Sequence, residues 1–308
     1  ARLNVDLDFI ESKTTYWEDV VAIIKQNVQT MSDAYEIIFT SNNTVTQQKL
    51  FNYFHDFNDS EYIDIAADWW YEDAIMETSV DNYNYRFLYG DISIMDMGVA
   101  GTVYYNKELY EQYLSTSKNA DELYYKVLDG QWTIDLLIQY AKDAWVDTNQ
   151  SGVPDLPDKV GILSSDGSAS YDGFLTAFGI DMLAKTDDGG LEIVWDPDKV
   201  SSAIDYNIAL LSENNGAYIN PDEPTLINKF TNDEALFWLF YIYPSAEVNQ
   251  ALRSMNSTYG LLPMPKFDLN QQNYYTTAQD AYSTMSIMAT SKQINEVGIM
   301  FEEWNYRS

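Results

Sequence analysis

The first forty residues carry a β-α-β pattern of hydrophobic and polar positions. Arg2–Phe9 alternates apolar and polar side chains at period two, which predicts a strand. Tyr16–Val28 has apolar residues at helical spacing, and Ala34–Thr40 is an apolar run that predicts a second, buried strand. Two strands joined by a helix favour a parallel α/β sheet.

The middle and the end of the chain continue to mix strands and helices. Gly101–Tyr105 is rich in β-branched and aromatic residues, which is typical of a strand. Thr133 is a good helix N-cap, and the apolar spacing after it predicts a helix over Ile134–Trp145. We expect further helices at 171–178, 200–211 and 296–306, a helix passing into a strand at 228–240, and a strand at 286–289.

Composition narrows the chemistry that this chain can perform. Its 308 residues suggest about two domains. With 17 Lys and Arg against 48 Asp and Glu, the net charge is −31, which repels nucleic acids and anionic membranes and attracts cations. The chain has no cysteine and a single histidine, His55, so disulfides and thiolate sites are excluded and a Ser-His-Asp triad is disfavoured. No apolar run approaches the roughly 20 residues that a membrane helix needs.

Three motifs resemble the extracellular solute-binding proteins of ABC importers, the family that includes maltose-binding protein. The first is a strand ending in Tyr105-Asn106-Lys107, a short helix, and Trp132-Thr133 before a second helix. Tyr259–Lys266 is similar to the family's "Y/F-G-apolar-x-P-x-P" sequence. Lys229–Ala235 is similar to its "F-x-x-G-x-A" motif, with Asp233 where glycine is usual.

The resemblance implies an α/β fold, namely a two-lobed periplasmic-binding-protein-like (type II) fold with a ligand cleft between the lobes. It assigns residues 1–101 and 266–308 to the first lobe and residues 102–265 to the second. Members of the family have an additional opening strand and helix and additional closing helices. We therefore expect the chain to lack both ends of the natural protein.

The function implied by the resemblance is capture of a carbohydrate or oligosaccharide by hinge closure. The partners would be the permease subunits of an ABC importer, and no nucleic acid. We expect a monomer outside the cell, either a membrane-anchored lipoprotein of a Gram-positive bacterium or a periplasmic protein. One alternative is a non-transporting carbohydrate-binding or sensor protein with the same fold.

A glycoside hydrolase is the third candidate, and the sequence favours it least. That reaction needs a pair of carboxylates, and no signature singles out two of the 48 acidic residues. The chain also has no phosphate loop, dinucleotide-binding glycine motif or nucleophile elbow. We therefore expect a binding protein that is not an enzyme and needs no catalytic cofactor.

Candidate ligand-binding residues follow from the chemistry of sugars. Sugars have apolar C–H faces that stack on aromatic rings and hydroxyl rims that bond to carboxylates and amides. Asp96 and Asp280 precede strands that cross between the lobes and can accept hydrogen bonds from hydroxyls. The other candidates match cleft segments of the family, and they are Trp69, Trp70, Tyr171, Asp172, Tyr241 and Tyr243.

The segment Asp147–Asp158 matches a calcium-binding loop. Such loops place oxygen ligands at positions 1, 3, 5, 7, 9 and 12 and a glycine at position 6, which here is Gly152. A metal-free turn rich in Asp, Asn and Gly is the alternative, and a bound ion would have a structural role. The candidate calcium ligands are Asp147, Asn149, Ser151, the Val153 carbonyl, Asp155 and Asp158.

Overall fold

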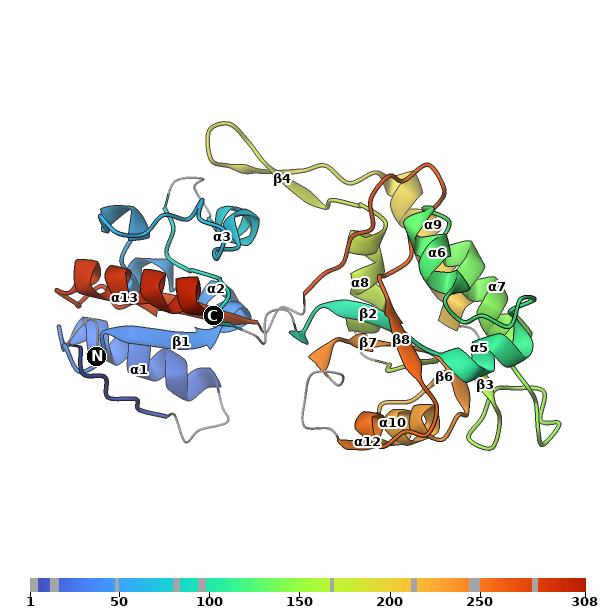
Figure 1. Ribbon diagram of the computed structural model, residues 1–308. Helices are drawn as coiled ribbons and strands as arrows, with labels where there is room; N and C mark the ends of the chain where they lie inside the picture. Colours follow the sequence, from blue (N-terminus) through green and yellow to red (C-terminus); the bar gives the residue numbers. More distant parts are fainter. Residues whose placement is uncertain are drawn as a thin grey trace. The chain divides into compact units, whose positions relative to one another are not determined.

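The computed structural model divides the chain into two compact units (Figure 1). It describes residues 5–11, 17–47, 50–79, 84–93, 98–166, 169–211, 215–243, 250–278 and 282–308. Unit 1 comprises Ala1–Asp96, Lys185–Glu192 and Asp280–Ser308, and unit 2 comprises Met97–Ala184 and Ile193–Gln279. The segment 266–279, which the sequence places in the first lobe, belongs to unit 2 here, where Lys266 pairs with Thr133.

Unit 1 is a two-stranded sheet covered by helices. Strand β1 (Ile37–Ser41) pairs antiparallel with β9 (Ser283–Ile287). The core contains Ile24, Phe54, Leu88, Ile287 and Phe301, all at most 2% exposed. The helical elements are α1 (Trp17–Gln29), α2 (Asn42–Gln47), η1 (Phe51–Tyr53), η2 (Phe57–Asp59), α3 (Glu72–Thr78) and α13 (Ile294–Arg307).

Two predictions for the first forty residues are wrong. Residues 5–9 form neither strand nor helix, and Val5 and Phe9 are 50% and 73% exposed; residues 2–4 lie outside the described part. A period-two pattern becomes a strand only when a neighbouring strand accepts its backbone hydrogen bonds. The sheet is antiparallel because the described partner of β1 is β9 and not the segment that precedes α1.

Unit 2 contains a five-stranded mixed sheet in the order β6-β3-β7-β2-β8. Strands β6 (Ala217–Ile219), β3 (Val160–Ser164) and β7 (Ala235–Tyr241) are parallel. Strand β2 (Gly101–Asn106) is antiparallel to both β7 and β8 (Tyr259–Leu262). The parallel sheet expected from the sequence is thus found only in part, because β2 runs opposite to the other four strands, β8 included.

Helices surround this sheet. They lie where the apolar spacing of the sequence predicts helices, although their first and last residues differ from the predicted ones. The helix expected at 228–240 begins earlier, at Glu223, and leads into β7 as predicted. Among the described residues, no helix is long and apolar enough to cross a membrane. The helices are α5 (Lys107–Tyr113), α6 (Glu122–Leu128), α7 (Ile134–Ala144), α8 (Ala169–Ala177), α9 (Pro197–Leu211), α10 (Glu223–Thr231) and α12 (Gln250–Arg253). A separate hairpin of β4 (Leu183–Lys185) and β5 (Leu191–Ile193) contains Lys185–Glu192, the segment that belongs to unit 1.

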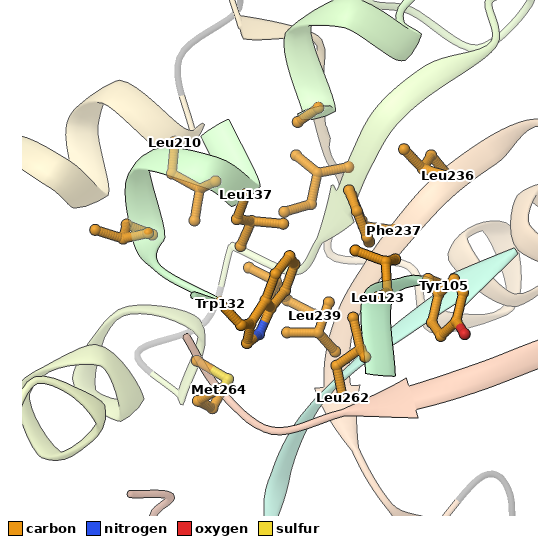
Figure 2. Packing of buried hydrophobic residues seen from close by; sticks show 14 of the residues in the cluster. Tyr105, Leu123, Trp132, Leu137, Leu210, Leu236, Phe237, Leu239, Leu262 and Met264 are labelled. Atoms are coloured by element: carbon orange, nitrogen blue, oxygen red, sulfur yellow. The ribbon is translucent and has the colours of Figure 1, made fainter. Parts of the chain in front are cut away.

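Both faces of the sheet in unit 2 are covered by apolar clusters. On one face Trp132 is fully buried among Leu137, Phe237 and Met264 (Figure 2). Its indole Nε1 donates to the Pro263 carbonyl oxygen at 2.9 Å. The second cluster includes Tyr104, Phe230 and Trp238. The sheet is therefore a rigid base from which loops can present functional groups.

Helix α7 begins at the predicted residue but is capped differently from the prediction. Thr133 has the extended backbone of an N-cap, yet its side chain makes no capping hydrogen bond. The first helical N–H, that of Ile134, donates instead to the Lys266 carbonyl oxygen at 2.9 Å. A neighbouring chain segment thus accepts a hydrogen bond from one of the first N–H groups of the helix, which have no partner within the helix itself.

Candidate functional site

The carboxyl ends of the three parallel strands in unit 2 form one edge of its sheet. Ser164 of β3 lies opposite Ile219 of β6, and Leu163 lies opposite Trp238 of β7. The Ser164 carbonyl oxygen accepts a hydrogen bond from the Asn220 N–H at 3.1 Å. Ligands of open α/β sheets bind at such an edge, so we place the candidate site of unit 2 here.

Two predicted tyrosines come together at this edge. Tyr241 ends β7 and Tyr243 follows it, with ring centroids 6.4 Å apart and an angle of 24° between the rings. Both side chains are half-buried. The Tyr243 hydroxyl donates to Glu223 Oε1 at 2.8 Å. Glu223 stands in the first turn of α10, and sequence reasoning missed it because the contact joins residues twenty positions apart.

Four other candidates, two from each predicted lobe, are placed by their backbone only or not at all. Tyr171 and Asp172 stand in the first turn of α8, the helix that follows β3. Their backbone therefore belongs to the same edge, whereas their side chains lie outside the described part. Asp96 and Asp280 also lie outside the described residues, so their roles stay predictions.

The two candidate tryptophans of unit 1 differ in environment. Trp70 is 4% exposed and packs in the core of the unit. Trp69 is half-buried, and its ring meets that of Tyr306 edge to face at 5.1 Å. Of these two tryptophans, Trp69 is the one that is partly exposed. The ligand-binding role of Trp70 stays a prediction, and its burial gives it a structural role.

A polar cluster at the carboxyl end of β1 was missed by sequence reasoning. The Ser41 hydroxyl donates to Asn43 Oδ1 at 2.8 Å. The Tyr89 hydroxyl donates to Asn42 Oδ1 at 3.0 Å, at the first residue of α2. The signal was available, because the polar run Thr40–Thr44 directly follows an apolar strand. These amides and hydroxyls suit the hydroxyl rim of a sugar.

The predicted calcium loop gathers most of its candidate ligands. Asp147 accepts hydrogen bonds from the backbone N–H groups of Ser151 and Gly152, at 3.1 and 2.9 Å. Asn149 Nδ2 donates to Asp155 Oδ2 at 2.8 Å. Asp155 Oδ1 is buried and has no hydrogen-bond partner among the described residues. Gly152 has a φ of +80°, as the tight turn of such a loop requires.

Asp158, the last candidate ligand of the loop, has both carboxylate oxygens bonded to protein. It is fully buried. Oδ1 accepts from the Thr148 N–H at 2.8 Å and from its hydroxyl at 3.0 Å, and Oδ2 accepts from Trp145 Nε1 at 3.1 Å. Burial raises the pKa of Asp158, but these hydrogen bonds outweigh it and hold the pKa below the ordinary value.

Lys229 of α10 binds the backbone of the loop Asp147–Asp158 at its carboxyl-terminal end. Its buried ammonium donates to the carbonyl oxygens of Leu156 at 2.8 Å and Asp158 at 2.6 Å, and it lies 3.5 Å from the Glu234 carboxylate. Burial lowers the pKa of Lys229, although Glu234 opposes this effect. In the part of the chain that the structure describes, no three His, Asp or Glu side chains are arranged to hold a metal ion.

A polar pocket of about 230 Å³ lies elsewhere on unit 2, beside Lys107, Glu108 and Asp121. It stands at the Asn106 end of β2, whereas Tyr241 pairs with Gly101 at the other end. Its acidic groups are already engaged, since Glu108 accepts from the Thr258 N–H and Asp121 pairs with Lys107 at 2.9 Å. We therefore do not assign the ligand site to this pocket.

Comparison with protein-family models and with curated proteins finds no match to this chain. Comparison with solved structures finds sugar-binding proteins. The chain is similar to the GacH receptor of Streptomyces glaucescens, solved unliganded and with acarbose, at a TM-score of 0.55 and 14% identity over 94% of this chain and 65% of that one. It is similar to the galacto-N-biose-/lacto-N-biose I-binding protein of the Bifidobacterium longum ABC transporter at a TM-score of 0.60 and 12% identity, over 95% and 64% of the two chains.

A third similar structure is maltose-bound MalE3 of T. maritima, with a TM-score of 0.54 and 16% identity over 94% of this chain and 66% of that one. The chain thus spans just under two thirds of the length of these proteins. The likeness shows the fold. The chain has the two-lobed α/β fold of periplasmic-binding-protein-like sugar-binding proteins, which confirms the fold class expected from the sequence.

Proposed function

We propose that this protein is the carbohydrate-binding component of an ABC importer. The fold that it shares with sugar-binding proteins of ABC transporters supports this function. The observation that carries it within the chain is the aromatic pair Tyr241 and Tyr243 with Glu223 at the carboxyl edge of the sheet. Near-parallel aromatic rings beside a carboxylate offer a stacking surface and a hydroxyl acceptor together, which is the combination that a sugar requires.

Capture would proceed by ligand-driven closure of the two units. Unit 1 contributes Trp69 and the polar residues after β1, and unit 2 contributes the tyrosine pair. A ligand that contacts both sets of residues at once stabilises a closed arrangement and shifts the population towards it. We propose that the permease subunits recognise this arrangement outside the cell, and that a lipid anchor or a periplasm retains the protein there.

We also propose that the loop Asp147–Asp158 holds a structural calcium ion. Calcium takes six to eight oxygen ligands, and carboxylate, amide and carbonyl oxygens are suitable. The unpartnered Oδ1 of Asp155 and the neighbouring Asp147 and Asn149 support the proposal. Asp158 would then act as a supporting residue, since its oxygens already accept hydrogen bonds from the loop and Trp145.

A thermal-shift screen against sugars tests the proposed function. The panel contains maltose, maltotriose, acarbose, lacto-N-biose and tagatose, with amino acids and peptides as controls. A ligand at a hundred times its Kd adds about 2.7 kcal/mol of stability, which raises the melting temperature by about 5–10 °C. A shift with one sugar series supports the proposal. Shifts with peptides or amino acids alone would refute carbohydrate binding.

A matched pair of variants locates the site. Tyr243→Ala removes one ring of the pair and the hydroxyl that bonds to Glu223, and we expect it to weaken sugar binding by about 1–3 kcal/mol. Tyr125→Ala is the control, because Tyr125 on α6 is 60% exposed and belongs to neither candidate site. Equal sugar affinities of both variants and the wild type by calorimetry would remove Tyr243 from the site.

A further inference from the structure

Three N–H donors converge on one carboxylate in unit 1. Glu302 of α13 accepts a hydrogen bond from Trp69 Nε1 on Oε2 at 2.7 Å. Its Oε1 accepts from Trp70 Nε1 at 2.9 Å and from the backbone N–H of Asp64 at 2.7 Å. Two adjacent indole rings are therefore fixed by a single acidic residue more than 230 positions further along the chain. Hydrogen bonds to an ionised acceptor are among the stronger ones in proteins.

The backbone that carries the two tryptophans is fixed independently of Glu302. Trp70 forms an antiparallel bridge with Gly90, and the Asp91 N–H donates to the Trp69 carbonyl oxygen at 3.0 Å. A Cβ on Gly90 would lie 2.7 Å from that oxygen, so the close approach requires glycine. With the backbone held, the remaining freedom of Trp69 is the rotation of its side chain. Glu302 removes that freedom.

The two indoles have different exposure, which separates their roles. Trp70 is buried and anchors Glu302 from the core side. Trp69 is half-buried, and its only polar atom is already bonded to Glu302. Its ring also meets that of Tyr306 edge to face at 5.1 Å, so Trp69 can offer a ligand the remaining apolar surface of its ring but no side-chain hydrogen bond. A ring of this kind suits the apolar face of a sugar.

We propose that Glu302 is a positioning residue that holds Trp69 in one orientation as a stacking surface for the sugar. This inference rests on the proposed function, because the sugar is the ligand that the ring would contact. Fixing the ring before binding removes an entropic penalty that a freely rotating side chain would add. The effect of Glu302 on binding therefore passes through Trp69.

The test uses Glu302→Gln with Glu303→Gln as the matched control. Glutamine keeps the shape of the side chain but places an NH₂ donor against one or two of the three N–H groups, depending on its orientation. Glu303 on the same helix pairs with Arg307. Trp69→Phe, alone and combined with Glu302→Gln, completes a double-variant cycle. For each protein we would measure melting temperature, tryptophan emission without sugar, and Kd for the sugar that shifts the wild type.

We expect Glu302→Gln to shift the emission of Trp69 to longer wavelength and to weaken sugar binding by about three- to thirtyfold. In the Trp69→Phe background the same change should weaken binding less than twofold, because the indole N–H that Glu302 holds is gone. Glu303→Gln should leave both quantities unchanged. This pattern supports positioning, which a purely structural role would not produce.

Two results would overturn the inference. The first is a lower melting temperature for Glu302→Gln with unchanged sugar affinity, which would reduce Glu302 to a structural residue. The second is unchanged tryptophan emission, which would mean that Glu302 does not orient the ring. Failure of the proposed function is distinguishable from both results, because the wild-type protein would then bind no sugar. The comparison of tryptophan emission would still decide whether Glu302 holds Trp69.

Discussion

Asp158→Asn tests how the loop 147–158 is held. The substitution keeps the size of the side chain and one acceptor oxygen but replaces the other oxygen with an NH₂ donor. If the amide oxygen faces Thr148, the new NH₂ faces the Trp145 indole N–H and the Asp155 backbone N–H, which now donate to Oδ2 at 3.1 and 3.4 Å. The opposite orientation leaves the Thr148 N–H without an acceptor, while the Thr148 hydroxyl keeps the Pro157 carbonyl oxygen at 2.8 Å. Either way, at least one buried donor loses its acceptor and the others lose a charged partner.

The expected loss of stability follows from these contacts. Leaving a buried donor unpaired costs about 1–3 kcal/mol, and the Asp155 bond is the weakest because it is the longest. We expect Asp158→Asn to lower the free energy of unfolding by about 2–4 kcal/mol. For a domain of about 150–250 residues, this lowers the melting temperature by about 4–16 °C.

The assay is thermal unfolding of Asp158→Asn and of Asp147→Asn, each with calcium and with a chelator. Asp158→Asn should be destabilised in both conditions, because its partners are protein groups. Asp147→Asn should lose more stability with calcium than with chelator, because the loss of an ion ligand then adds to the loss of a backbone hydrogen bond from Ser151 or Gly152. A wild-type melting temperature for Asp158→Asn in chelator would refute the reasoning about its hydrogen bonds. Equal destabilisation of Asp147→Asn with and without calcium would refute the ion.

The stability difference between wild type and Asp158→Asn should depend on pH with a definite sign. The folded-state pKa of Asp158 is depressed, so the folded state releases its proton at lower pH than the unfolded state. The stabilisation by its carboxylate is therefore present above the unfolded value of about 3.9 and is lost as the pH falls through the folded value. The difference in unfolding free energy between wild type and Asp158→Asn should shrink below about pH 4.

Three further changes probe the fold. Lys229→Met should destabilise unit 2 by about 1–3 kcal/mol in urea unfolding, because the carbonyl oxygens of Leu156 and Asp158 lose the donor that they share. The folded-state pKa of Lys229 is depressed, so the unfolded chain binds more protons just below the unfolded-state lysine pKa of about 10.4. The stability difference between wild type and Lys229→Met should therefore grow as the pH rises towards that value, and a constant difference would contradict this. Trp70→Ala should cost about 3–5 kcal/mol in the same assay, as expected for a buried ring, and near-neutral stability would mean that the ring is not in the core. Gly161→Ala should cost about 3 kcal/mol by calorimetry, because its Cβ would overlap the Ala141 carbonyl oxygen of α7, and a wild-type melting temperature would disprove that close approach.

The fold was largely predictable because strong periodicity and a few motifs coincide. The helix after Thr133 and the strand ending at Tyr241 were found from local patterns, which buried elements maintain. Asp233 illustrates the value of a motif. It stands where the resembled motif usually has glycine, and its φ of +62° lies in the left-handed region that glycine adopts readily. The failure at residues 5–9 arose because local alternation does not reveal whether a pairing strand exists.

The candidate site was less predictable, because side-chain environment depends on contacts distant in sequence. Trp69 and Trp70 are adjacent and chemically identical, yet one is half-buried and the other belongs to the core. Glu223 and Glu302 gain their roles from tyrosine and tryptophan partners on other segments. No local pattern distinguishes these two acids from the other 46 in the chain.

The high aromatic content and the high acidic content of this chain are physically connected. A tryptophan or tyrosine that is buried or half-buried needs an acceptor for its N–H or O–H group. Carboxylates supply that acceptor at three separate places: Glu302 for Trp69 and Trp70, Asp158 for Trp145, and Glu223 for Tyr243. Two of these pairings lie at proposed ligand-binding residues and one secures the proposed calcium loop. The net charge of −31 therefore describes more than a solvated surface, since particular carboxylates orient the rings on which the proposed function depends.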